Sequence, residues 1–326
     1  MSRTININIR ACIPFALELC LLLMTIGGCK APPDIFTVGI VAYADSVATG
    51  REGFKDGMAE LGYIENENIR YVNVFLSENN DQMTDLKIKE LLSQDVDLIL
   101  TSGPIILKSK EILKGDLPIL FGGDAYPVES GMVRSLKHPG GNITGVKTAD
   151  NISKALEWLT TIANGAKKVY LPYGPDDSMS IRVLSELNKA ASELGIELVI
   201  QKVSSVEETI AAIEDLPKDI DAVFMVPSKI LNPRSNELNR AAIKRSLPTG
   251  AAIKLDEEVL VTFSSDFYNV GKKTARLAQQ IQQGAKPSDL PVETADTLLI
   301  INLKTAEKIG VMIPDSILAQ ATTIIR

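Results

Sequence analysis

Residues 37–76, TVGIVAYADSVATGREGFKDGMAELGYIENENIRYVNVFL, hold two short apolar runs on either side of an amphipathic segment. Thr37–Tyr43 is rich in β-branched residues, which is typical of a strand that is covered on both faces. Within Phe54–Leu61 apolar residues recur at helical spacing, and Gly62 can end that helix in a left-handed cap. With Ile69–Leu76 as the next strand, the stretch predicts a strand–helix–strand unit of a parallel sheet.

The same alternation continues along the rest of the chain. A first set of elements ends with a strand at Ile143–Thr148, and a second set begins directly after it. Strands that alternate with helices imply parallel sheets with right-handed crossovers. We therefore predict an α/β fold of two doubly wound parallel-sheet lobes joined by a hinge. Further strands are expected at 96–102, 118–122, 167–173, 196–203, 221–227, 249–253, 259–263 and 297–302, and helices at 81–94, 106–113, 152–163, 179–194, 206–215, 234–247 and 269–284.

The last elements are too few for a third domain, so we expect the two lobes to share them. The N-terminal α/β lobe then comprises residues 37–147 plus about 269–296, and the C-terminal α/β lobe comprises 148–268 plus about 297–326. A chain that crosses several times between two lobes makes a hinge, which is what closure over a ligand requires.

The chain begins with the features of an export signal. Two arginines precede a mostly apolar run, Ala11–Ile26, which is short for a permanent membrane span and ends in small residues that a signal peptidase can accommodate. Glu18 departs from the pattern because it places a carboxylate within the run. Residues 1–28 are therefore predicted to be a lipoprotein signal peptide that is removed.

Cys29 follows Ile-Gly-Gly, and this sequence resembles the lipobox of bacterial lipoproteins. Acylation of the thiol would make Cys29 the new amino terminus and the membrane anchor, with residues 29–36 as a lipidated tether. A stray buried cysteine is the alternative, but Cys12 and Cys20 both lie in the segment to be removed. We expect the chain in the cell envelope, lipid-anchored to a membrane and facing the periplasm or exterior.

Composition argues against several classes of function. The formal charge of -7, with acids and bases interspersed, does not suit a nucleic-acid partner. The sequence has no GxSxG, GxxxxGK[ST] or post-strand GxGxxG motif and no Cys or His grouping for a metal. The sole histidine, His138 in the turn HPGGN, is expected to face solvent. We expect no enzyme activity, no cofactor or metal, and a monomer that binds a small molecule.

In open parallel sheets, ligands bind beyond the carboxyl ends of the strands. The loops at these positions are rich in hydroxyls, carboxylates, glycines and tyrosines, which can hydrogen-bond an ammonium or carboxylate and stack on a planar group. Capping of strand-to-helix turns uses the same residue types, so each position has a purely structural alternative. The candidate ligand-binding residues are Asp45, Ser46, Ser102, Gly103, Asp124, Tyr126, Tyr173, Asp177, Ser178, Ser228, Lys254, Asp256 and Asp266.

Four stretches carry a family resemblance: REGFKDGMAELGYIENENIRYV (51–72), LKHPGGNITGV (136–146), NVGKKTARLAQQIQQGAKPSDLPVE (269–293) and INLKTAEKIGVMIPDSIL (301–318). They resemble the tryptophan- and tyrosine-type ABC transporter substrate-binding proteins, and the likeness extends over Val38–Leu318. It implies a type I periplasmic binding protein whose lobes close on one small ligand, often an amino acid, and present it to an ABC permease with its ATPase. By this resemblance the ligand loops correspond to Asp45, Ser46, Ser102, Gly103, Asp124, Tyr173, Ser178, Ser228 and Asp266.

The chain departs from the family pattern on the expected cleft. GGDAYP stands where family members tend to have a small or hydroxyl residue followed by Thr-Asp-Pro, and the segment before Val259 is about two residues shorter and carries Lys254, Leu255 and Asp256. These departures leave room for a ligand other than the better-known amino acids of the family.

Two other functions remain open at the level of sequence. The same two-lobe capture could serve a sensor that signals to a chemoreceptor or kinase, and gene neighbourhood would separate this from import. A surface enzyme of the glycosyl-transferring sort would need carboxylates such as Asp176 or Asp266, and loss of turnover on Asp-to-Asn substitution would favour it.

Overall fold

The computed structural model describes residues 35–43, 48–76, 81–103, 105–113, 115, 117–149, 151–175, 178–228, 230–255 and 258–326. The predicted signal peptide, the predicted anchor Cys29 and the candidates Asp45, Ser46, Asp177 and Asp256 lie outside the described residues. Phe36–Arg326 form one compact unit, and its strands build two sheets. No described helix has both the length and the apolar character needed to cross a membrane.

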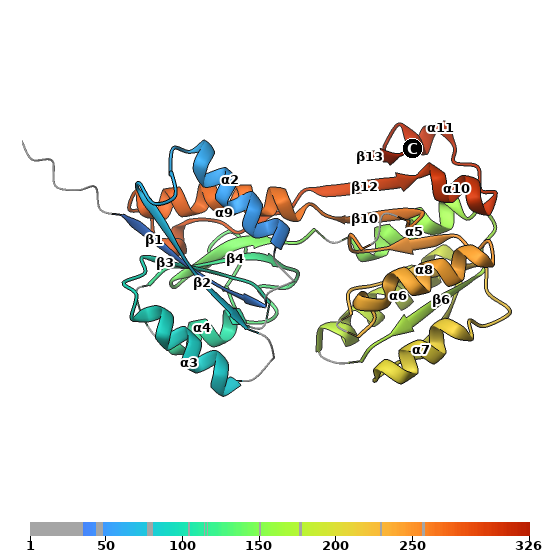
Figure 1. Ribbon diagram of the computed structural model, residues 1–326, viewed down its shortest axis with the longest axis horizontal. Coiled ribbons are helices and arrows are strands. Elements are labelled where there is room, and N and C mark those ends of the chain that lie inside the picture. Colours follow the sequence, from blue (N-terminus) through green and yellow to red (C-terminus); the bar gives the residue numbers. More distant parts are fainter. Residues whose placement is uncertain are drawn as a thin grey trace, which may run out of the picture. The chain divides into compact units, whose positions relative to one another are not determined.

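The first sheet has the strand order β11-β5-β4-β3-β1-β2, and all its strands are parallel. Helices α2 and α9 cover one face, and α3 and α4 cover the other (Figure 1). The elements are β1 (Phe36–Tyr43), α2 (Ala48–Glu60), β2 (Ile69–Leu76), α3 (Asp81–Leu92), β3 (Leu98–Thr101), α4 (Ile105–Leu113), β4 (Ile119–Asp124), β5 (Ile143–Lys147), α9 (Phe267–Gln282) and β11 (Glu293–Thr294).

Strand β3 shows why the sequences of these strands are apolar at every position. Leu98 and Leu100 pack in the core with residues of α2 and α9, whereas Ile99 between them packs in the core with residues of α3 and α4. Because successive side chains of a strand point to opposite faces, a sheet covered on both faces needs apolar residues at every position.

The second sheet has the strand order β13-β12-β10-β9-β8-β6-β7. Helices α5 and α6 pack on one face, and α7 and α8 pack on the other. Its elements are α5 (Ile152–Ile162), β6 (Lys168–Tyr173), α6 (Ser178–Leu194), β7 (Glu197–Lys202), α7 (Val206–Glu214), β8 (Ala222–Met225), α8 (Ser235–Lys244), β9 (Thr249–Ala251), β10 (Val261–Ser265), β12 (Thr297–Asn302), α10 (Leu303–Ile309), α11 (Asp315–Leu318) and β13 (Thr323–Ile325).

The expected fold class is confirmed, since both sheets are doubly wound and dominated by parallel pairs. Strand β12 departs from the predicted parallel direction, since it runs antiparallel to β10. Only residues 295 and 296 separate β12 from β11 in the first sheet. The chain therefore re-enters the second sheet beside β10, at the edge where it left. Because no helix lies between β11 and β12 to carry the chain back to the other end of the sheet, β12 runs antiparallel to β10.

The chain passes between the two sheets three times, from β5 to α5, from β10 to α9 and from β11 to β12. Hydrogen bonds join these links to one another. The backbone N–H of Ala149 donates to Ser265 Oγ at 3.1 Å, and that of Asp266 donates to the carbonyl oxygen of Asp296 at 2.8 Å. The three links therefore form one hydrogen-bonded group.

Glycines bring α2 and α9 into backbone contact. A Cβ added to Gly53 would lie 2.0 Å from the carbonyl oxygen of Tyr268, and one added to Gly271 would lie 2.1 Å from that of Gly50. Any side chain at these two positions would push the helices apart. The contact places a helix from late in the chain on the first sheet, beside the start of α2, and so helps to build the pocket described next.

Candidate functional site

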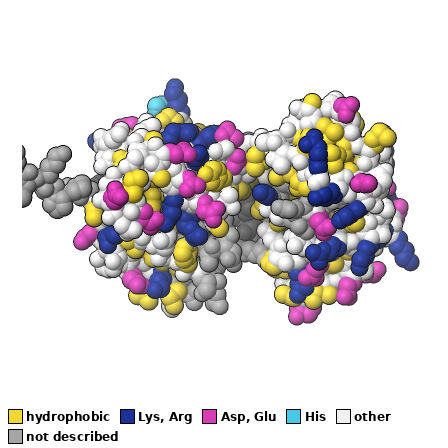
Figure 2. Space-filling model, turned by 45° about the horizontal axis from the view of Figure 1, so that its top comes forward, with side chains coloured by type: hydrophobic (Ala, Val, Ile, Leu, Met, Phe, Trp, Pro, Cys, Tyr) yellow, Lys and Arg dark blue, Asp and Glu magenta, His cyan; other side chains and the backbone are white. Residues whose placement is uncertain are grey.

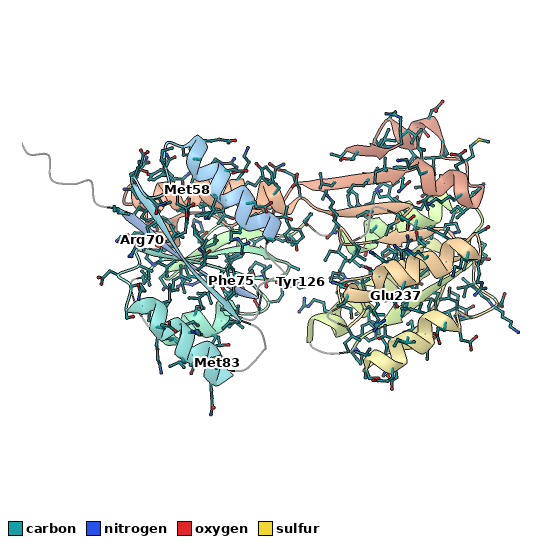
Figure 3. All side chains as sticks on the ribbon, viewed as in Figure 1. Met58, Arg70, Phe75, Met83, Tyr126 and Glu237 are labelled. Atoms are coloured by element: carbon teal, nitrogen blue, oxygen red, sulfur yellow. The ribbon has the colours of Figure 1, made fainter. Side chains whose placement is uncertain are left out.

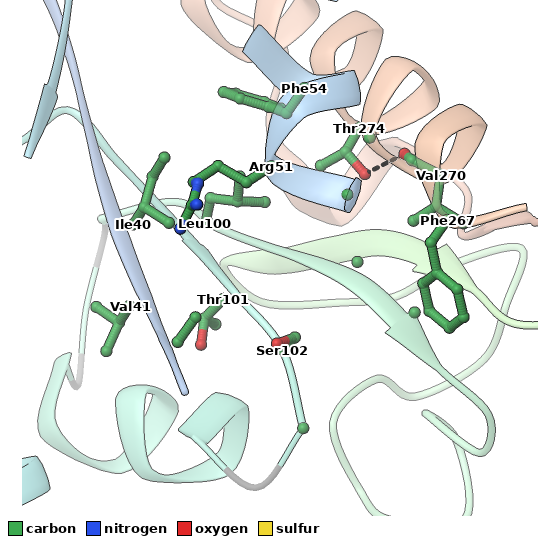
Figure 4. A pocket seen from close by; sticks show the side chains of 16 residues that line it. Ile40, Val41, Arg51, Phe54, Leu100, Thr101, Ser102, Phe267, Val270 and Thr274 are labelled. Carbon is green, nitrogen blue, oxygen red and sulfur yellow. Dashed lines mark hydrogen bonds between the residues drawn. The ribbon is translucent and has the colours of Figure 1, made fainter. Parts of the chain in front are cut away.

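A pocket of about 280 Å³ lies at the carboxyl ends of β1, β3 and β4, where α2 and α9 begin (Figure 4). We call it the apolar pocket because most of its wall is hydrocarbon, including the side chains of Ile40, Phe54, Leu100, Phe267 and Val270. Its position agrees with the rule that ligands of open α/β sheets bind beyond the carboxyl ends of parallel strands.

Arg51 is the only charged residue among the described residues that line the apolar pocket. Its guanidinium carbon lies 4.8 Å from the ring centroid of Phe75, a cation–π contact with a residue near the end of β2 (Figure 3). Thr274, a polar wall residue, donates its hydroxyl hydrogen to the carbonyl oxygen of Val270 at 2.7 Å. Arg51 therefore supplies the charged hydrogen-bond donors of the described wall, and the hydroxyls of Thr101 and Ser102 are further polar groups in it.

A second pocket, of about 250 Å³, lies beside the links between the sheets. We call it the acidic pocket because the charged residues among its described lining are Asp124 and Glu186. Tyr126 and Phe267 supply aromatic rings, and Asn151 lies at the start of α5. An acidic, partly aromatic wall suits a cationic group of a ligand.

Asp124 ends β4 and is only 8% exposed. Its Oδ1 accepts a hydrogen bond of 2.8 Å from the backbone N–H of Tyr126. Burial raises the pKa of the Asp124 carboxyl, and the nearby charge of Glu129 raises it further, while the Tyr126 N–H acts in the opposite direction. A ligand ammonium would give this buried carboxylate an opposite charge, which no described residue supplies.

Tyr126 joins the loop after β4 to helix α6 of the second sheet. Its hydroxyl donates to Glu186 Oε1 at 2.5 Å, and the guanidinium carbon of the exposed Arg182 lies 4.5 Å from its ring centroid. Arg182 and Glu186 are four residues apart on α6, which places them on one side of the helix. The contact fixes the tyrosine ring in the wall of the acidic pocket.

The two pockets share Gly103, Gly123 and Phe267 in their walls. They are therefore two arms of one site, the apolar arm at the carboxyl ends of β1, β3 and β4 and the acidic arm toward α5 and α6. Gly123 has a positive φ of 86°, and a Cβ there would lie 2.7 Å from Cε1 of Phe267. A larger residue at Gly123 would crowd the junction between the arms.

The structure brings four of the predicted site residues to this place. Ser102 and Gly103 line the apolar pocket, and Asp124 and Tyr126 line the acidic pocket. Ser178 is the first residue of α6, and its side chain lies outside the described part of the chain.

The remaining described candidates are not among the lining residues of either pocket. Tyr173 is 3% exposed in the core of the second sheet. Ser228 accepts a 3.3 Å hydrogen bond from the backbone N–H of Leu231, and Asp266 caps α9 by accepting from the N–H of Asn269 at 3.1 Å. The side chain of Lys254 is exposed. Asp266 thus has the capping role that was the structural alternative, and Ser228 stabilises the turn that follows β8.

Sequence reasoning missed Arg51, Asn151, Glu186 and Phe267. Asn151 is buried and donates its Nδ2 hydrogens to the carbonyl oxygens of Ala252 at 2.9 Å and Phe263 at 3.0 Å, which ties the start of α5 to the second sheet. Arg51 and Glu186 lie within helices, where a charged residue ordinarily indicates the solvent face. A useful signal for Arg51 was its place in the first turn of α2, next to the loop after β1.

We also searched the described part of the chain for a metal site, for a buried histidine and for a strongly charged surface. It contains no group of three or more His, Cys, Asp or Glu side chains placed to hold a metal ion. His138 is exposed, as expected. Figure 2 shows acidic and basic side chains interspersed over the visible face rather than gathered into one patch of a single sign.

A protein family described as ABC transporter substrate binding protein matches residues 37–325. The chain is also similar to a tyrosine-binding protein of Clostridioides difficile (strain R20291). The two are 27% identical over 264 residues, which cover 80% of this chain and 76% of the relative.

Solved structures share the fold. A conserved domain protein from Vibrio cholerae superposes with a TM-score of 0.79 at 22% identity, covering 89% of this chain and all of that one. An ABC domain from Streptococcus pneumoniae, solved in complex with L-Trp, superposes with a TM-score of 0.78 at 23% identity, covering 90% of this chain and all of that one. At these identities the likeness is evidence for the fold alone.

Proposed function

Because the chain belongs to the family of ABC transporter substrate-binding proteins, we propose that it captures an amino acid outside the cytoplasm and delivers it to the permease and ATPase subunits of an importer. Members of this family bind solutes and are not enzymes, and they work outside the cytoplasm. The chain has the type I periplasmic binding protein fold of its structural relatives.

One observation carries the amino-acid assignment: an arm lined by two carboxylates opens into an arm lined by hydrocarbon. The ammonium group of an amino acid fits beside Asp124 and Glu186, and an apolar side chain fits between Phe54, Leu100 and Val270. The names of two relatives point to the same ligand class, one being a tyrosine-binding protein and the other a domain solved with L-Trp.

Capture would proceed by closure of two lobes. Residues 37–147 with about 269–296 would form one lobe, and residues 148–268 with about 297–326 the other. The three hydrogen-bonded links between the sheets support this division, because few residues would have to change conformation when the lobes move. The contact between Tyr126 and Glu186 would then be made or broken by closure.

The chain would be held at a membrane by lipid on Cys29, after removal of residues 1–28 as a signal peptide. The support is the lipobox-like sequence and the apolar run before it. Mass spectrometry of the full-length chain recovered from bacterial membranes should find an acylated amino-terminal Cys29, and Cys29→Ser should remove the chain from the membrane fraction. An unlipidated wild-type chain in the cytosol would contradict the anchor.

The binding experiment uses the chain without residues 1–29, which leaves the compact unit Phe36–Arg326 whole. Calorimetry and thermal unfolding are followed with each of the standard amino acids, and with purines and small sugars as other ligand classes. An amino acid present at about 100 times its dissociation constant should stabilise the fold by about 2.7 kcal/mol. Asp124→Asn should abolish this gain, whereas the matched control Asp315→Asn, at an exposed position of α11, should keep it. The proposal fails if no amino acid binds.

A further inference from the structure

Arg51 is placed to do more than stabilise the fold. Its guanidinium lies on the ring of Phe75, which occupies the flat face of the group and leaves the N–H donors at its edge. No described carboxylate pairs with it, and the other described walls of the apolar pocket carry no charge. Arg51 is half-buried and lines the pocket, so a ligand that brings an oxygen into the apolar pocket can accept a charged hydrogen bond from it.

The acidic pocket, in contrast, favours a cationic group of the ligand. Asp124 and Glu186 line it, and Gly103, Gly123 and Phe267 connect it to the apolar pocket. In Figure 4 the side chain of Arg51 reaches in from α2, while Phe267, which belongs to both arms, lies on the far side of the same pocket. A ligand that fills the whole site therefore meets carboxylates at one end, hydrocarbon in the middle and a guanidinium at the other end.

We infer that Arg51 is a specificity-determining residue, which selects an amino acid whose apolar side chain ends in a hydrogen-bond acceptor. The inference rests on the proposed function and sharpens it to a chemical class. The phenol oxygen of tyrosine meets the requirement. Phenylalanine has no acceptor, and the indole of tryptophan offers an N–H donor that would face the donors of Arg51.

Gly122 gives the pocket the depth that such a side chain needs. A Cβ at this residue would lie 3.4 Å from Cγ1 of Val270 and 3.7 Å from Oγ1 of Thr274, which are ordinary contact distances. Gly122 is not among the glycines with positive φ. The backbone at Gly122 therefore accepts a Cβ, and the two methyl groups of Gly122→Val narrow the pocket, which tests whether the ligand uses this arm.

The test is calorimetric titration of tyrosine, phenylalanine and tryptophan into the wild-type chain and into Arg51→Met, which keeps length and apolar stem but removes charge and donors. A hydrogen bond to a charged group corresponds to about a tenfold or larger difference in affinity. The wild-type chain should bind tyrosine at least about tenfold more tightly than the other two. In Arg51→Met tyrosine should fall to the affinity of phenylalanine, which should itself change by less than about twofold. Arg51→Lys should restore part of the preference.

Two further measurements serve as controls, one for loss of folding and one for use of the apolar pocket. Thermal unfolding of the ligand-free variants should be close to wild type, which separates lost recognition from lost folding. Gly122→Val should weaken tyrosine binding by at least about tenfold, because the side chain no longer fits.

Several outcomes would overturn the inference: a wild-type chain that binds phenylalanine or tryptophan as tightly as tyrosine, an equal loss for all three ligands in Arg51→Met, or wild-type affinity in Gly122→Val. Binding of only other amino acids, without a side-chain acceptor, would also overturn it and leave the proposed function intact. If no amino acid binds at all, the proposed function itself has failed.

Discussion

Asp124 shows how one buried carboxylate can be costly for the fold and useful for the site. Its ionised form is disfavoured by burial, since the free site offers it a single described backbone donor and no described cation. Asn at this position keeps an acceptor for the Tyr126 N–H and removes the charge. Asp124→Asn should therefore lose amino-acid binding while the ligand-free chain unfolds at the same or a higher temperature. A clear loss of stability in this variant would show that Asp124 has a structural role instead.

The same residue predicts a pH dependence of binding. The free chain has a raised pKa at Asp124, and a ligand ammonium beside it would lower the pKa in the complex. Affinity should then be full above the free-chain pKa of Asp124 and fall as pH drops through it, because the proton must be displaced on binding. Calorimetric affinities measured from neutral to mildly acidic pH check this, with Glu186→Gln to separate the second carboxylate. A flat profile would contradict ammonium binding at Asp124.

The sequence predicts the site residues that lie in loops after strands, and it misses those that lie on helices. Ser102, Gly103, Asp124 and Tyr126 follow parallel strands, so the topological rule was enough to find them. Arg51 and Glu186 lie on helices, and which face of a helix meets a pocket depends on packing partners distant in sequence. Tyr173 ends a strand in the same way as Asp124, but its ring packs into the core, which a loop position alone does not reveal.

The close contact between helices α2 and α9 can be tested by substitution of its glycines. Gly53→Ala would place a Cβ within 2.0 Å of a backbone oxygen of α9, which cannot move away as a side chain could. We expect a loss of at least about 1–3 kcal/mol in the free energy of unfolding, measured by urea denaturation. Gly50→Ala is the control on the same helix, since its Cβ would lie at an ordinary 3.5 Å from the carbonyl oxygen of Phe267. Equal effects of the two substitutions would contradict the close helix contact.

The positions of helices and strands were largely predictable from the sequence, whereas the pairing and direction of the last strands were not. The period of the apolar residues placed β2 at Ile69–Leu76 and α5 from Ile152, because both patterns arise within a single element. The direction of β12 and the pairing of β13 were not readable, because they depend on the edge at which the returning chain enters the second sheet.

The two sheets repeat one strand order, and this order decides where a ligand can be held. In both sheets the first five strands follow the order second, first, third, fourth, fifth, counted along the chain within each set. Each sheet therefore presents loops at the carboxyl ends of its parallel strands, and residues from both sets line the acidic pocket. A ligand held by both sets would bias any motion about the three links toward the conformation in which both can contact it.

Small-angle X-ray scattering of the chain without residues 1–29, with and without a saturating amino acid identified by calorimetry, tests this capture most directly. We expect a smaller radius of gyration with ligand, and no change in Asp124→Asn at the same ligand concentration. An identical radius with and without ligand, under conditions where calorimetry proves the wild-type site occupied, would contradict closure of two lobes on a bound amino acid.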